Sequence, residues 1–114
     1  MTNPVDQWLQ QAARTRGILA CGVRLSDQSL RVRVCREDIS KARVEEAMKR
    51  IAATVGTMQT AQGTAELLRW VFESGDIVCA LRPGGAMAVL LVNRDLAAAD
   101  KIKALMQTFA ETTL

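Results

Sequence analysis

The sequence predicts an α/β chain of the α+β type, with the order αββαβββα and a five-stranded antiparallel sheet. Three observations predict it. Apolar residues recur at three- and four-residue spacing in three segments, which is typical of amphipathic helices. Five shorter runs are continuously apolar or alternate with polar residues, as strands do. Ser-Gly and Pro-Gly-Gly turns separate the last three runs, so these strands are expected to form an antiparallel meander.

The composition is that of one ordinary globular domain spanning residues 1–114, with 49% hydrophobic and 24% charged residues. No apolar run reaches the roughly 18 residues that a membrane span needs. The first eleven residues carry Asp6 and three glutamines where a secretory signal would be basic and then apolar. We therefore expect a cytoplasmic protein without a membrane partner. A net charge of +3 decides little about other partners.

The first helix is expected to begin near Pro4, because Asn3 is a good N-cap and Asp6 faces the positive helix end. Gly17 should end it. Next, Ile18–Val23 is almost continuously apolar, which indicates a strand covered on both faces. Its neighbour Leu30–Val34 alternates apolar residues with arginines, as an edge strand with one wet face does.

The central helix is expected to be capped by Asp38 or Ser40 and to stop at Gly56, which makes it short. A polar connector, Thr57–Thr64, should follow. Three strands are then expected, at Leu67–Glu73, Asp76–Arg82 and Ala86–Val92. The closing helix should begin near Asp95, with an apolar stripe that comprises Ala98, Ile102, Leu105, Met106 and Phe109.

The strand order follows from apolar content, because strands buried on both faces belong in the middle of a sheet. The first and fifth strands are the two such runs. Placing them side by side gives the order 2-1-5-4-3, with the second and third strands at the edges. The first and last helices should cover one face of the sheet and the central helix the other.

The chain offers little catalytic chemistry. It has no histidine, so the commonest general base and metal-binding nitrogen is absent. Cys21, Cys35 and Cys79 are odd in number and lie in apolar runs, which favours buried thiols in a reducing compartment. We therefore expect no enzyme activity, no cofactor and no metal. An enzyme that uses one of the cysteines is the alternative, and it would need a reactive, exposed thiol.

The third strand is the most informative element, because Leu68, Trp70 and Phe72 line one face of an edge strand that lacks proline and lysine. Pairing with the same strand of a second copy would protect this edge and join two sheets into one. The alternative is that these side chains face the protomer's own helices. The sequence predicts a homodimer at this edge.

A second feature supports the dimer. A single helix covers only part of a five-stranded face, so a second copy's central helix could bury the rest. Val44, Met48 and Ile51 are placed to take part. The alternative is that the connector after this helix folds over the gap.

The arginines Arg31, Arg33 and Arg36 form a row that could contact an acidic protein surface or phosphates. Such a row also serves simply to keep an edge strand soluble. No aromatic residue alternates with them to stack on a base, so nucleic acid is not an expected partner.

The whole pattern resembles the roadblock family, which includes dynein light chains and bacterial regulators of Ras-like GTPases. The resemblance covers about Val5 to Phe109. It lies in Ile18–Leu25 leading through Asp27 into Leu30–Val34, and in the meander Leu67–Val92 leading through Asn93-Arg94-Asp95 into the last helix. It implies a homodimer with a ten-stranded sheet that acts as a scaffold or regulator for a small GTPase. The short central helix and a first hairpin turn without glycine depart from the family pattern.

A different class of protein also mixes few strands and helices and dimerises. Small secretion chaperones cradle an unfolded client segment, and this remains the alternative function. Such chaperones look typically acidic, whereas this chain has a net charge of +3.

Overall fold

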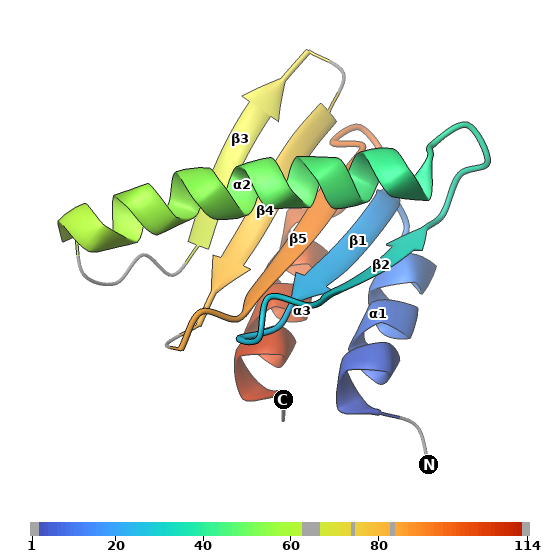
Figure 1. The fold of residues 1–114 in the computed structure, drawn as a ribbon. Helices are drawn as coiled ribbons and strands as arrows, with labels where there is room; N and C mark the ends of the chain where they lie inside the picture. Colours follow the sequence, from blue (N-terminus) through green and yellow to red (C-terminus); the bar gives the residue numbers. More distant parts are fainter. Residues whose placement is uncertain (1–2, 63–66, 74, 83, 113–114) are drawn as a thin grey trace.

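The computed structural model describes residues 3–62, 67–73, 75–82 and 84–112, and it contains the predicted order of elements (Figure 1). Their bounds are α1 (Pro4–Arg14), β1 (Ile18–Arg24), β2 (Leu30–Val34), α2 (Lys41–Gln62), β3 (Leu67–Phe72), β4 (Gly75–Leu81), β5 (Met87–Val92) and α3 (Ala99–Glu111). No helix in these ranges is both long and apolar enough to cross a membrane.

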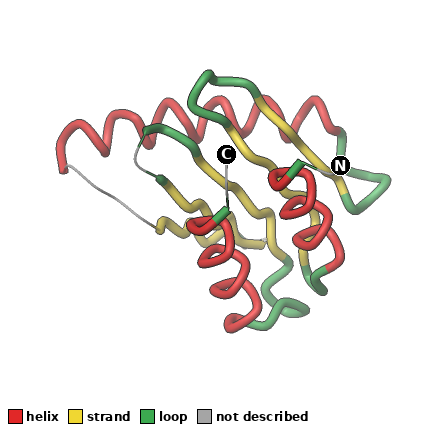
Figure 2. The backbone as a smooth tube through the Cα atoms, turned by 90° about the horizontal axis from the view of Figure 1, so that it is seen from below, coloured by secondary structure: helices red, strands yellow, loops and turns green. Residues whose placement is uncertain are grey.

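The strands form one antiparallel sheet of order β2-β1-β5-β4-β3, which confirms the predicted topology. The two strands with the most continuous apolar sequence, β1 and β5, lie in the middle and are largely buried. α2 crosses one face of the sheet in Figure 1. α1 and α3 lie side by side on the other face in Figure 2, as predicted.

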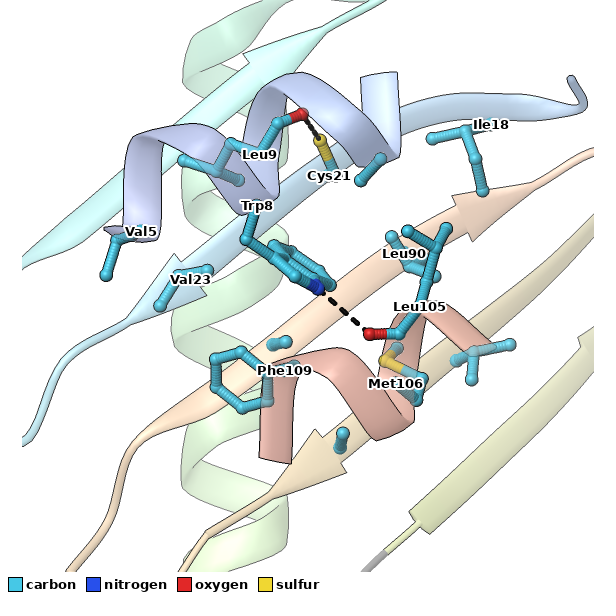
Figure 3. Packing of buried hydrophobic residues seen from close by; sticks show 14 of the residues in the cluster. Val5, Trp8, Leu9, Ile18, Cys21, Val23, Leu90, Leu105, Met106 and Phe109 are labelled. Atoms are coloured by element: carbon cyan, nitrogen blue, oxygen red, sulfur yellow. Dashed lines mark hydrogen bonds between the residues drawn. The ribbon is translucent and has the colours of Figure 1, made fainter. Parts of the chain in front are cut away.

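The larger core lies between the sheet and the pair α1 and α3, and Trp8 is at its centre (Figure 3). The indole Nε1 of Trp8 donates a hydrogen bond of 2.9 Å to the carbonyl oxygen of Leu105. The Trp8 ring also packs at a tilt on Phe109, with 5.4 Å between the ring centroids. This one side chain therefore joins the first helix to the last.

The smaller core lies beneath α2 and contains Met48, Val55, Cys79, Met87 and Val89. Around it, Leu68, Trp70, Ile77 and Leu81 on β3 and β4 are only partly buried. α2 alone therefore leaves apolar surface partly covered at the β3 end of this face.

The expected stop of the central helix at Gly56 is wrong, because α2 continues to Gln62. A glycine inside a helix costs only about 1 kcal/mol, and no proline follows to break the hydrogen bonding. The expected short helix is thus 22 residues long. The expected connector is helical up to Gln62, and its last two residues lie outside the described part of the chain.

The starts of α2 and α3 are set by local hydrogen bonds. The Ser40 hydroxyl accepts a 3.4 Å hydrogen bond from the Arg43 N–H at the start of α2, whereas Asp38 pairs with Arg36 at 2.7 Å. Ser40 is therefore the cap. The expected start of the last helix near Asp95 is wrong, because the Asn93 side chain accepts the Asp95 N–H and forms a turn that delays α3 to Ala99.

Candidate protein-interaction surface

The free edge of β3 is the most exposed apolar feature of the described residues. β3 pairs only with β4, and it ends the sheet. Leu67, Val71 and Phe72 are 54%, 64% and 49% exposed, and within the described ranges the one other exposed large apolar side chain is Leu96. An edge strand with such side chains is a ready template for another strand. We call Leu67–Phe72 the β3 edge.

The two faces of the β3 edge differ in surroundings, because successive side chains point to opposite faces. Leu68 and Trp70 are partly buried against the core beneath α2. Phe72 is the next residue on that face, yet it is half exposed. Leu67 and Arg69 lie on the other face, beside α3.

The predicted interface residues on α2 lie deeper than a contact surface. Val44 and Met48 are buried within the protomer, and Ile51 is partly buried in the same core. Within the protomer, these side chains lie between α2 and the sheet. The structure therefore brings together Leu68, Trp70 and Ile51 around one core, with Phe72 at its exposed end.

The opposite edge of the sheet, β2, is charged. Arg31 forms a 3.2 Å ion pair with Asp6 of α1. Arg36, beyond the strand, is held by Asp38. Arg33 is exposed and has no ion pair with another described residue. Two of these three predicted partner-binding arginines thus already have carboxylate partners. With its charged side chains, the β2 edge is better protected than the β3 edge against pairing with another strand.

A buried ion-pair network, which the sequence reasoning missed, lies beside the turn of the β3–β4 hairpin. Asp76 is only 3% exposed, and its carboxylate accepts hydrogen bonds from Arg69 on β3 and from Arg94 after β5. The Arg69 Nε contact is 2.9 Å. Burial raises the pKa of Asp76, but hydrogen bonds and charges from the two arginines outweigh it, so the net pKa is lowered. An acid just after a turn, within an apolar strand, was the available signal.

The cysteines do not gather into a site. Burial raises the pKa of Cys21 and of Cys79 to about 12, so both are neutral thiols at physiological pH. The expectation of burial is wrong for Cys35, which follows the end of β2 and is exposed. Its thiol donates to the Ala13 carbonyl oxygen at 3.7 Å. No cluster of three or more potential metal-ligating His, Cys, Asp or Glu side chains occurs among the described residues.

Comparison with known proteins gives similarity of fold. No protein-family model and no curated protein matches the chain. Among solved structures, a Roadblock/LC7 domain from Streptomyces avermitilis matches with a TM-score of 0.65 and 13% identity, over 95% of this chain and 89% of that one. The gliding protein MglB from Thermus thermophilus matches with a TM-score of 0.67 and 12% identity, over 97% and 91%.

A third solved structure, MglC from Myxococcus xanthus, matches with a TM-score of 0.58 and 18% identity, over 95% of this chain and 94% of that one. In each case nearly the whole of both chains is covered. The order of helices and strands and the sheet topology thus agree with the family that the sequence resembles. The chain has the fold of the Roadblock/LC7 domain proteins.

Proposed function

We propose that the chain is a non-enzymatic, homodimeric scaffold or regulatory module in which two protomers pair antiparallel through the β3 edge. The observation that carries the proposal is the unpaired, apolar β3 edge itself, with Leu67, Val71 and Phe72 about half exposed or more. Pairing two such edges would satisfy their free backbone groups and make one ten-stranded sheet.

The partly covered core beneath α2 supports the same arrangement. Within the β3 edge, Trp70 and Leu68 retain exposed surface on the face that carries α2. A symmetry-related α2 would lie next to them once the two edges pair, and it would exclude water from both sets of side chains. Val44 and Met48 are buried in the protomer, so we place them behind the interface rather than in it.

We further propose a Ras-like small GTPase as the partner that the dimer regulates. This part of the proposal is supported by the fold alone, which the chain shares with Roadblock/LC7 domain proteins and with the gliding protein MglB. The test is a pull-down with a small GTPase encoded nearby, loaded with GDP or with a non-hydrolysable GTP analogue. Retention that depends on the nucleotide supports regulation, and no retention in either state contradicts it.

The dimer is tested by the solution mass from light scattering. We expect twice the 12.4 kDa chain mass for the wild type and for Leu96→Asp, an equally exposed apolar residue outside β3. Phe72→Asp and Val71→Asp should both give the monomer mass, because each brings a charge to the symmetric edge. Circular dichroism confirms that each variant is folded. A monomeric wild type, or folded variants that stay dimeric, would contradict the β3 interface.

A further inference from the structure

A long groove runs between α3 and the β3 end of the sheet. One part is a cavity of about 430 Å³ next to Arg94, and the other is a cavity of about 580 Å³ next to Arg82. Leu67, Lys103 and Met106 line both cavities, so the two adjoin each other along α3. We call this combined feature the α3 groove.

The α3 groove exists because two helices do not cover five strands. Neighbouring strands are about 4.8 Å apart, so the sheet is roughly 24 Å wide, whereas two packed helices cover about 20 Å. In Figure 2 the strands continue beyond α3 on the side away from α1. Leu67 is left 54% exposed there. The strip of sheet beside α3 is therefore covered by neither α1 nor α3.

The floor of the groove is apolar and its borders are basic. Ile102 and Met106 of α3 face Leu67 and Val78 of the sheet across it. Such a floor binds apolar side chains by removing them from water.

Four cations surround this floor. Arg69 and Arg94 lie at one end on either side of Asp76, Lys103 lies in the middle, and Arg82 lies at the other end. Among the described residues, Asp76 is the one carboxylate that lines the groove, and both its oxygens already accept arginine hydrogen bonds. Lys103 is exposed and has no ion pair with a described residue. The described residues that line the groove therefore carry an excess of positive charge.

We infer that the α3 groove binds an acidic amphipathic helix of another protein, which lies beside α3 as a third helix on this face. α3 has 13 residues, which gives a groove wall of about 20 Å and suits a helix of about 14 residues. Apolar residues of the bound helix contact Leu67 and Met106, and its carboxylates approach Lys103 and Arg69. This surface goes beyond the proposed dimer. Edge pairing uses backbone groups of β3, while the side chains of Leu67 and Arg69 stay on the groove face.

Binding of a synthetic helical peptide tests the inference. The probe has about 14 residues, with leucines on one face and glutamates on the other. Its controls are the same peptide with lysines in place of the glutamates, and a scrambled sequence. Fluorescence anisotropy of the labelled peptides, added to the full chain, gives the dissociation constants. Of the three peptides, we expect only the acidic one to bind, and we expect added salt to weaken its binding.

Two matched pairs of variants locate the binding. Lys103→Glu and Leu67→Gln should each weaken acidic-peptide binding by about fivefold or more. Lys101→Glu, on α3 but outside the groove lining, and Leu96→Gln, equally apolar and exposed, should leave it unchanged. Circular dichroism verifies that each variant keeps its fold.

Four outcomes would overturn the inference. Two concern the peptides: the wild type does not bind the acidic peptide, or it binds the lysine peptide equally well. The other two are that Lys101→Glu and Lys103→Glu weaken peptide binding equally, or that the chain binds decyl sulfate but not the peptide. The last result would assign the groove to a small anionic amphiphile. A change in solution mass with Leu67→Gln, without peptide binding, would assign it to contact between copies of this chain. The solution mass should stay that of the wild type in Lys103→Glu, so failure here is separable from failure of the proposed dimer.

Discussion

Asp76 connects three separate segments through one carboxylate. Its oxygens receive hydrogen bonds from Arg69 on the neighbouring strand and from Arg94, which lies 18 residues further along the chain. Arg94 also donates to the Glu73 carbonyl oxygen at 3.3 Å, next to the β3–β4 turn. A buried charge is stable only when it is paired and hydrogen-bonded, and Asp76 satisfies both conditions. The position of the β3 edge therefore depends on this residue.

Asp76→Asn should lower the free energy of unfolding at neutral pH, because the amide leaves two guanidinium groups beside each other without a carboxylate. The folded state lowers the pKa of Asp76, so its contribution to stability is fully present above about pH 4. That contribution is lost as the pH falls through the lowered pKa. Urea unfolding at several pH values should show the difference between wild type and variant narrowing below about pH 4.

The matched control is Asp95→Asn, an exposed carboxylate without an ion pair to a described residue. Its unfolding curve should follow that of the wild type across the same pH range. A constant difference between Asp76→Asn and wild type down to about pH 2 would mean that the ion pairs contribute little and that the amide disturbs packing instead.

Where α1 leads into β1, the backbone at Gly17 lies against the loop that leads into α3. Gly17 has φ of +91°, and a Cβ there would lie 2.6 Å from the Ala97 backbone nitrogen. Its carbonyl oxygen accepts the Asn93 N–H at 2.7 Å. No flexible side chain can move aside here, because the nearest atoms are the backbone nitrogen, Cα and Cβ of Ala97. The start of β1 and the loop that follows β5 are thus held in close contact.

Gly17→Ala should therefore destabilise the fold by about 2–4 kcal/mol, from the left-handed backbone and the contact with Ala97 together. Gly84→Ala isolates the first contribution, because Gly84 has φ of +94° but a Cβ added there would meet nothing within 4 Å, and it should cost about 1 kcal/mol. Urea denaturation of both variants gives the comparison. Equal losses would show that the loop beside Ala97 yields without cost.

The elements of this fold differ in how well the sequence predicts them. The strand order follows from Ile18–Val23 and Ala86–Val92, whose apolar residues on both faces allow only central positions. The length of α2 does not follow, because Gly56 fits both a helix end and a helix interior. The start of α3 depends on the turn that Asn93 forms, and neighbouring residues alone do not show which hydrogen bond prevails.

The candidate surface residues, too, are only partly predictable from the sequence. Alternation along β3 correctly groups Leu68, Trp70 and Phe72 on one face, but it does not show how much of each side chain the protomer covers. The network at Asp76 and the α3 groove depend on pairs of residues far apart in sequence, such as Leu67 and Met106. Their proximity is a consequence of the assembled sheet. A local pattern can mark Asp76 as an acid in an apolar strand, but it does not identify the residues that pack against it.

At the scale of the whole molecule, the two proposed binding surfaces lie in different places. In the proposed dimer the β3 edge would present backbone groups and apolar side chains to a second copy, whereas the α3 groove lies on the face that carries α1 and α3. α2 lies on the opposite face. A dimer formed through β3 would carry two α2 helices on one side and two grooves on the other. Such an arrangement suits a scaffold that holds different partners on its two faces.

If the β3 edges pair as proposed, unfolding and dissociation should be coupled, because the partly covered core around Trp70 is completed only in the dimer. The midpoint of thermal unfolding should then rise with protein concentration, by about 3 °C for each tenfold increase in a dimer of this size. Differential scanning fluorimetry over a roughly hundredfold concentration range measures it. Phe72→Asp should show a lower midpoint that does not depend on concentration, whereas Leu96→Asp should behave as the wild type does. A wild-type midpoint independent of concentration would mean that each protomer is stable without its partner, and that the apolar β3 edge serves a transient contact.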